Sequence, residues 1–338
     1  MKFLITGGAG FIGSHLSERL LSLNHDVTII DILSTGSFNN IEHLSDHPRF
    51  HFAIDTITNE LVMDRLVSEC DVIFHLAAAV GVDLIIKNPV NVIETNILGT
   101  DILLNVAQRY RKKVLIASTS EIYGKSNYSS FNEESDRLLG PTTKSRWCYS
   151  ASKAVDEFLG LAYYSQKNLP VVIFRLFNTV GPRQIGQYGM VIPRFVKQAL
   201  EGKALTVYGD GKQSRCFCNV EDSVRAIIGL AESNDAVGQV FNIGSTQEIT
   251  ILDLAHRVLK IVDEQTNIMT QGTENKVTLQ NNAKEERIVF IPYDLAYEKG
   301  FEDMRHRKPD IKKIKDFIGW EPNIGLDETL QQIVASMK

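Results

Sequence analysis

A tyrosine and a lysine four residues apart are the residues in this sequence best suited to proton transfer. Tyr149 and Lys153 would lie one turn apart on a helix, with their side chains on the same face. A free phenol has a pKa near 10, and a neighbouring ammonium group lowers that pKa by favouring the phenolate. Such a tyrosine could take the proton of an alcohol while a hydride leaves the same carbon.

A glycine-rich turn near the start of the chain points to the hydride acceptor. Gly7, Gly10 and Gly13 directly follow an apolar run at residues 2–6 and precede a periodic apolar segment. This spacing provides a tight turn, a close backbone approach to a pyrophosphate and close packing of the following helix. Phe11 and Ile12 belong to the same turn, so we assign all five residues to a dinucleotide site. A positively charged nicotinamide would further favour the phenolate of the tyrosine.

The end of the second apolar run indicates which dinucleotide binds. Asp31 stands 18 residues after Gly13, where a carboxylate can accept both adenosine ribose hydroxyls and would repel a 2′-phosphate. No arginine follows it closely, so the sequence favours NAD over NADP. The alternative is that Asp31 only caps the end of a strand.

Further cofactor contacts are expected after the third and fourth strands. Asp55 and Thr56 could flank the adenine, and Leu76, Ala77 and Ala78 would let the backbone approach the cofactor. The alanines could equally serve core packing.

Two more polar positions belong to the predicted cofactor site or lie beside it. Asn96 stands among apolar residues, either as a buried, satisfied amide or as a strut for the active site. Ser118, Thr119 and Ser120 end the fifth strand, and one hydroxyl there could hydrogen-bond the reacting oxygen. We choose Thr119 as the third catalytic residue, with Tyr149 and Lys153, and Ser118 and Ser120 remain rivals. Ser118, Tyr149 and Lys153 are also expected to bind the cofactor, and Lys153 would hold the nicotinamide ribose.

The elements that must position these residues alternate between short apolar strands and longer amphipathic helices. This alternation predicts an α/β fold, a Rossmann-type doubly wound parallel sheet with a smaller, mostly helical C-terminal substrate lobe. We expect an NAD-binding domain over residues 1–180 and the lobe over 181–338, with some later elements returning to the first domain. The expected strands are 2–6, 26–31, 50–53, 72–76, 113–118, 171–176, 205–208 and 240–243. The expected helices are 11–23, 60–69, 90–109, 151–168, 191–201, 222–232, 251–263 and 326–337, with a polar, exposed excursion at 264–290.

Composition excludes several other classes of protein. The 338 residues carry a formal net charge of -5 without a long basic run, which argues against nucleic-acid binding. No apolar run is long enough to span a membrane. The four cysteines form no disulfide framework or metal-ligand pattern, so we expect free thiols, no metal and a reducing cytoplasm.

Three segments together give the chain a family resemblance. Residues 7–13 (GGAGFIG), 149–153 (YSASK) and 176–183 (LFNTVGPR) resemble the extended short-chain dehydrogenase/reductases, and within them the NAD-dependent nucleotide-sugar epimerases and dehydratases. The resemblance runs from Lys2 to about residue 322 and implies a homodimer.

The resemblance also implies a binding site for a UDP-sugar. Asn178, Arg215 and Arg307 would contact the diphosphate, Tyr208 the uracil and Asp310 the uridine ribose. The other expected substrate residues are Ser120, Thr179, Arg183 and Val191. A sugar carboxylate could be held by Thr179, Arg183 and the hydroxyls of Ser118, Thr119 and Ser120.

The reaction subtype depends on a few departures from related patterns. Dehydratases carry Thr-Asp-Glu where this chain has Thr119, Ser120 and Glu121, so dehydration is not expected. UDP-glucuronate decarboxylases share this segment but usually carry an arginine near Met190. We therefore expect a 4-epimerase acting by transient C4 oxidation, most simply on UDP-glucuronate. The alternatives are a UDP-glucose/UDP-galactose 4-epimerase, a UDP-glucuronate decarboxylase, and an NAD-sensing protein of the same fold without catalysis.

Overall fold

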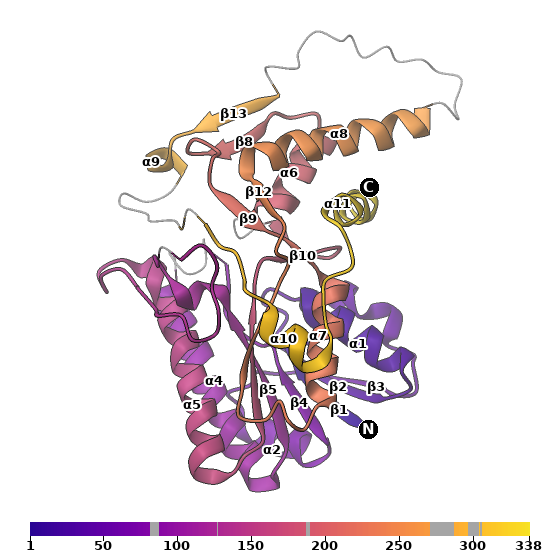
Figure 1. Cartoon of the computed structure of the whole chain (residues 1–338). Coiled ribbons are helices and arrows are strands. Elements are labelled where there is room, and N and C mark those ends of the chain that lie inside the picture. Colours follow the sequence, from indigo (N-terminus) through magenta and orange to yellow (C-terminus); the bar gives the residue numbers. More distant parts are fainter. Residues whose placement is uncertain (82–87, 127, 187–189, 271–286, 297–303, 305) are drawn as a thin grey trace.

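A seven-stranded parallel sheet forms the centre of the protein, as the computed structural model shows (Figure 1). The structure describes the 338-residue chain except residues 82–87, 127, 187–189, 271–286, 297–303 and 305. The strand order is β11-β6-β5-β4-β1-β2-β3, and every neighbouring pair is parallel. The strands are β1 (Lys2–Thr6), β2 (Asp26–Asp31), β3 (Phe50–Ile54), β4 (Val72–His75), β5 (Lys113–Thr119), β6 (Val171–Leu176) and β11 (Val240–Ile243).

Helices cover both faces of this sheet, which explains why its strands are nearly continuous apolar runs. In β1, Phe3 and Ile5 join one buried cluster, whereas Leu4 between them joins the cluster on the opposite face. The first cluster includes residues of α1 (Phe11–Ser22), α7 (Val220–Glu232) and α10 (Lys312–Ile318). The second cluster lies under α2 (Glu60–Ser68), α4 (Pro89–Tyr110) and α5 (Cys148–Lys167). The predicted doubly wound α/β fold is confirmed.

The predicted strands of this sheet and the predicted helices that cover it match the observed ones to within three residues at each end. The largest difference concerns α5, which begins at Cys148 rather than at residue 151. A short 3-10 turn at Ser145–Trp147 runs directly into the helix and starts it early. Tyr149 therefore lies in the first helical turn, on one face with Lys153.

The last strand of the sheet comes from the second half of the chain. β11 pairs with β6 at the sheet edge, with Phe241 opposite Phe174, and α7 packs against α1. The sheet therefore includes residues beyond 181, as anticipated for some later elements. The proposed boundary near residue 180 remains a prediction for the rest of the chain.

A smaller lobe lies beyond the carboxyl ends of the strands (Figure 1). It has its own buried cluster, with residues from the helices α6 (Val191–Leu200), α8 (Ile251–Thr270) and α11 (Leu326–Ser336). Its short strands form two-stranded sheets. β8 (Leu205–Tyr208) pairs with β13 (Ile288–Ile291), and β9 (Ser214–Cys216) pairs with β12 (Glu248–Thr250). The remaining elements are β7 (Thr179–Val180), β10 (Cys218–Asn219), α9 (Tyr293–Ala296), and 3-10 turns at Phe38–Asn40, Glu42–Leu44 and Ser120–Tyr123.

One expectation about the lobe is partly wrong. The segment 264–290 was expected to be an exposed excursion, but α8 continues to Thr270 and β13 begins at Ile288. β13 is held by parallel pairing with β8, a contact that polar composition could not reveal. Residues 271–286 lie outside the described part of the chain. None of the described helices combines the length and the apolarity that crossing a membrane would require.

Candidate active site

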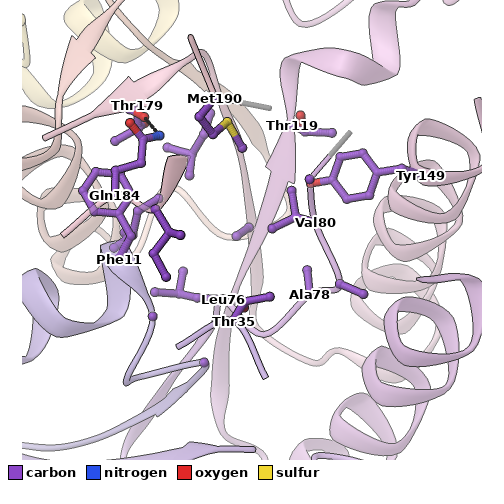
Figure 2. Close-up of a pocket in the computed structure, with 18 of the residues that line it drawn as sticks. Phe11, Thr35, Leu76, Ala78, Val80, Thr119, Tyr149, Thr179, Gln184 and Met190 are labelled. Atoms are coloured by element: carbon purple, nitrogen blue, oxygen red, sulfur yellow. Dashed lines mark hydrogen bonds between the residues drawn. The ribbon is translucent and has the colours of Figure 1, made fainter. Parts of the chain in front are cut away.

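A cavity of about 660 Å³ opens between the sheet and the lobe. It lies at the carboxyl ends of the strands, where doubly wound sheets bind ligands. Every residue predicted for the site lines it except Asn96 and Asp310. Figure 2 shows Tyr149 and Thr119 on one side of this cavity and Thr179, Gln184 and Met190 on the other.

The glycine turn is shaped by close backbone contacts. Gly7 has φ +72°, and a Cβ atom there would lie 2.9 Å from the backbone nitrogen of Ala77. A Cβ atom on Gly13 would lie 2.3 Å from the carbonyl oxygen of Gly7. Both positions exclude any larger residue, and they place the amide end of α1 at the cavity. This is the geometry expected for a pyrophosphate site.

Asp31 is fixed at the end of β2, in the cavity wall, by two backbone amides. Its carboxylate accepts hydrogen bonds from Ala9 N at 3.0 Å and from Leu33 N at 2.8 Å. Burial raises the pKa of Asp31, and these hydrogen bonds oppose that shift. An acceptor-only carboxylate held in this way suits ribose hydroxyls, so the residues present fit NAD.

The tyrosine predicted to be catalytic is buried but reaches the cavity. Tyr149 is 7% exposed, and it lines the cavity together with Thr119. Burial raises the pKa of Tyr149, and the charge of Glu121 adds to this, whereas the nearby Thr119 side chain lowers it. The sequence led us to expect a lowered pKa. The difference arises because the tyrosine is desolvated and because Lys153 donates a 2.8 Å hydrogen bond to Asp156.

The three candidate hydroxyls on β5 and the turn after it have different partners. Ser118 donates to Glu157, which is paired with Arg175 in the buried region behind the cavity. The Ser120 hydroxyl accepts a 3.4 Å hydrogen bond from Arg307. Thr119 lies close enough to the Tyr149 phenol to lower its pKa, and its hydroxyl accepts a 3.2 Å hydrogen bond from Glu121 N. These contacts favour Thr119, whose catalytic role remains a prediction.

A cluster of charged side chains surrounds the cavity next to Tyr149. Glu121 pairs with Arg146 through both of its carboxylate oxygens and lies 3.2 Å from Arg307. Burial alone would raise the pKa of Glu121, but the charges of Arg146, Arg307 and Arg215 outweigh it and hold the value at about 2. All four side chains line the cavity.

Two members of this cluster were not among the predicted site residues. Glu121 follows the hydroxyl-bearing positions directly, so its place at the end of β5 was an available signal. Arg146 stands just before Tyr149, and a single arginine ahead of a helix gives no signal of its own. Met190 and Gln184 also line the cavity and were missed as site residues, since they depend on how the lobe folds over the sheet.

Two predicted residues are not among the described residues that line the cavity. Asn96 is buried, and its amide links Ala79 N at 2.9 Å to Ser152 Oγ at 3.0 Å. Its amide is therefore buried and hydrogen-bonded, and it joins the loop after β4 to α5, which agrees with both interpretations of this residue. Its contact with the cofactor remains a prediction. One carboxylate oxygen of Asp310 accepts a hydrogen bond from Lys312 N at 2.8 Å, at the start of α10. Its expected contact with a ribose has no support here.

Arg183 lines the cavity, but its guanidinium forms its bonds with side chains of α1. Its guanidinium pairs with Glu18 and donates to Ser14 at 3.2 Å, both on α1. These bonds occupy the group that was expected to hold a sugar carboxylate. Thr179 and Asn178 line the same wall, with Thr179 bonded to Ser223 at 3.1 Å and the Asn178 amide donating to Cys216 O at 2.9 Å.

Comparison with known proteins agrees with this geometry. The family described as GDP-mannose 4,6 dehydratase matches residues 4–333. A UDP-N-acetyl-alpha-D-glucosaminuronate decarboxylase of Bacillus cytotoxicus is 41% identical over 335 residues, which are 98% of this chain and 97% of the relative. UDP-glucuronic acid decarboxylase 1 of Danio rerio is 35% identical over 98% of this chain and 72% of its own length.

Solved structures of similar proteins contain the expected cofactor. The UDP-glucuronic acid 4-epimerase of Bacillus cereus, in complex with UDP-glucuronic acid and NAD, has a TM-score of 0.84 at 28% identity, covering 100% of this chain and 99% of that one. The dTDP-glucose 4,6-dehydratase of Bacillus anthracis, in complex with NAD, has a TM-score of 0.80 at 29% identity, covering 100% and 96%. The chain is thus an NAD-dependent enzyme of the GDP-mannose 4,6 dehydratase family, among the extended short-chain dehydrogenase/reductases that act on nucleotide sugars.

Proposed function

We propose that this enzyme decarboxylates a UDP-linked hexuronate, with UDP-N-acetylglucosaminuronate and UDP-glucuronate as the two candidate substrates. The observation that carries the proposal is the charged cluster beside Tyr149, in which Arg146, Arg215 and Arg307 surround Glu121 in the cavity wall. Guanidinium groups bind carboxylates and phosphates well, so this wall suits a substrate that carries both. The first two relatives described above bear decarboxylase names, which supports the same choice over the 4-epimerase expected from sequence.

The first step is a proton transfer from the sugar. Tyr149, aligned by Thr119, would take the proton of the C4 hydroxyl in the cavity. NAD, when bound, accepts the hydride from C4 and can later return it. The helix N-terminus of α1 and Asp31 would hold the dinucleotide for this exchange.

The charged cluster would serve the second step. Once C4 is a ketone, the substrate carboxylate is β to a carbonyl, and the C5–C6 bond can break with release of carbon dioxide. The electron pair then moves onto the C4 oxygen as an enolate, which a proton at C5 converts back to a ketone. Arg307 is close enough to lower the pKa of Tyr149, so its positive charge also acts where this enolate oxygen forms. Ser120 replaces the aspartate of dehydratases, so no acid is provided there to expel water.

One observation favours 4-epimerisation as a second candidate. Met190 lines the cavity in the segment where decarboxylases usually carry an arginine, and an apolar residue there would leave the carboxylate less firmly oriented. An intermediate that rotates before it loses carbon dioxide would be reduced on its other face and regain a hexuronate with inverted C4.

Proton and ¹³C NMR of mixtures of the purified protein, NAD and substrate distinguishes decarboxylation from 4-epimerisation. Each candidate UDP-uronate, labelled with ¹³C at C6, is followed for sugar products and for labelled carbon dioxide. UDP-pentose signals together with labelled carbon dioxide support the proposal, and the faster substrate identifies the sugar. A UDP-hexuronate with inverted C4, formed without labelled carbon dioxide, would overturn the proposal and show that the enzyme is a 4-epimerase.

A further inference from the structure

The catalytic lysine has a buried partner on its own helix. The Lys153 ammonium donates to Asp156 Oδ2 at 2.8 Å, and the two side chains are 3% and 0% exposed. The residues are three apart on α5, so the helix itself keeps the two groups together. A buried ion pair of this kind is costly to form, and it is maintained only if its geometry is good.

The second oxygen of this carboxylate has no hydrogen-bond partner among the described residues. Asp156 Oδ1 is fully enclosed and accepts nothing, so the carboxylate keeps much of its negative charge available to its surroundings. Burial of an incompletely bonded carboxylate would be selected against if packing were its only purpose. The neighbouring Glu157 differs, because it forms a two-point ion pair with Arg175 and accepts from Ser118.

We propose that Asp156 is a positioning residue that holds the ammonium of Lys153 and offsets its charge, so that the phenol of Tyr149 stays protonated until a positively charged cofactor is present. The tyrosine could then act first as a proton acceptor and later as a proton donor within one cycle. This inference concerns the acid-base pair and rests on the proposed function only for its kinetic readout.

The charged groups around the Tyr149 phenol determine whether loss of Asp156 raises or lowers the pKa of the phenol. Glu121 after β5 and Asp156 on α5 both raise the pKa of Tyr149, whereas Arg307 from the lobe lowers it. On β4, His75 is fully buried, and its pKa is lowered to about 3 by burial and by Lys153, so it is neutral and adds no charge. Removing the charge of Asp156 should therefore lower the pKa of the phenol.

The test is a titration of Tyr149 that needs no substrate. Protein labelled with [¹³Cζ]tyrosine is titrated by NMR up to the highest pH at which the fold persists. The Tyr149 signal, one of ten, is assigned by its absence in Tyr149→Phe. In Asp156→Asn we expect its midpoint at least one pH unit lower, which is about a tenfold change in proton affinity. Asp156→Glu should restore the wild-type midpoint, and Asp235→Asn, an exposed carboxylate after α7, should not shift it.

Because loss of the buried Asp156 carboxylate can prevent folding, a second variant, Asp156→Ala, is titrated in the same way. Alanine keeps helix propensity and leaves room for a water molecule beside the ammonium. An unchanged or higher midpoint in either folded variant overturns the inference.

The kinetic readout is the acid limb of kcat/KM for decarboxylation, which should move to lower pH with the NMR midpoint. If the midpoint moves in a protein whose wild type turns over neither UDP-uronate, the inference holds and the proposed function fails.

Discussion

The two sides of the cavity are built in different ways. The dinucleotide side uses backbone amides, glycines and one carboxylate from elements close together in sequence, such as Gly7, Gly13 and Asp31. The other side, which we propose to bind the sugar and call the sugar side, brings together Glu121, Arg146, Arg215 and Arg307 from distant parts of the chain. The first side is determined by local backbone geometry, whereas the second depends on how the lobe closes over the sheet. Function within this fold is therefore decided on the sugar side.

The largest effect is expected at the residue where the two sides meet. Tyr149→Phe removes the phenol oxygen with little change in volume, so turnover should fall about 10³-fold. Binding of NAD, measured by calorimetry, should stay unchanged. Tyr164→Phe, an exposed tyrosine on the same helix, is the matched control. A loss below tenfold would mean that another group moves the proton.

The charged cluster should also contribute to stability. Glu121→Gln leaves three arginines around a neutral amide and should cost about 3 kcal/mol of unfolding free energy near neutral pH. The folded-state pKa of Glu121 is about 2, below its ordinary value of 4.5. Its contribution is thus complete above about pH 4.5 and is lost as the pH falls toward 2. Denaturant unfolding of both proteins across this range should show the difference shrinking as the pH falls. A constant difference would contradict the assignment.

Within the cluster, the shape of the guanidinium should matter as well as its charge. Arg307→Lys keeps the positive charge but removes the planar guanidinium, whose Nη1 contacts Ser120 and Glu121 while its other N–H groups remain for a carboxylate or phosphate, so kcat/KM for the UDP-uronate should fall about 100-fold. The control is Arg287→Lys, in the same lobe, whose ion pair with Asp263 is partly exposed. Equal effects of the two substitutions would show that Arg307 acts only on the fold.

On the dinucleotide side, Asp31→Asn should weaken NAD binding about tenfold, because a charged acceptor becomes a neutral one. The amide oxygen can still accept from one of the two backbone N–H groups that the carboxylate binds, so part of the turn's hydrogen bonding is kept. Loss of the negative charge should also reduce the preference for NAD over NADP, which calorimetry with both dinucleotides measures. Asp26→Asn, at the other end of β2, is the control.

The smallest effect on activity is expected away from the cavity. The homodimer implied by family resemblance remains a prediction, and α5 offers an apolar surface for it, with Phe158 66% and Val155 39% exposed. Phe158→Glu should shift the protein to monomers in light scattering while NAD binding persists. Leu61→Glu, an exposed apolar residue on α2, should leave the oligomeric state unchanged. A wild type that is already monomeric rules this prediction out.

The same difference between the two sides explains what could be predicted from sequence. β1, β2 and β6 were predicted to the residue because buried parallel strands are contiguous apolar runs. The glycine turn and the pair Tyr149–Lys153 are likewise local patterns. Arg146 could not be found, since its partner Glu121 is 25 residues away and the ion pair depends on the packed fold. Family resemblance gave the position of Asp310 but not the hydrogen bond that its carboxylate accepts from Lys312 N, and its contact with a ribose remains a prediction.

The edge strand β11 has a consequence for the order in which the chain can fold. β6 cannot pair on both sides until residues 240–243 have left the ribosome, long after the glycine turn. A nascent chain of 180 residues would expose the edge of β6 and the apolar surface that α7 covers. Long-range strand pairing of this kind slows folding and favours aggregation of incomplete chains. A fragment that ends near residue 180 should therefore need a chaperone to stay monomeric, although it contains the whole glycine turn and the catalytic helix.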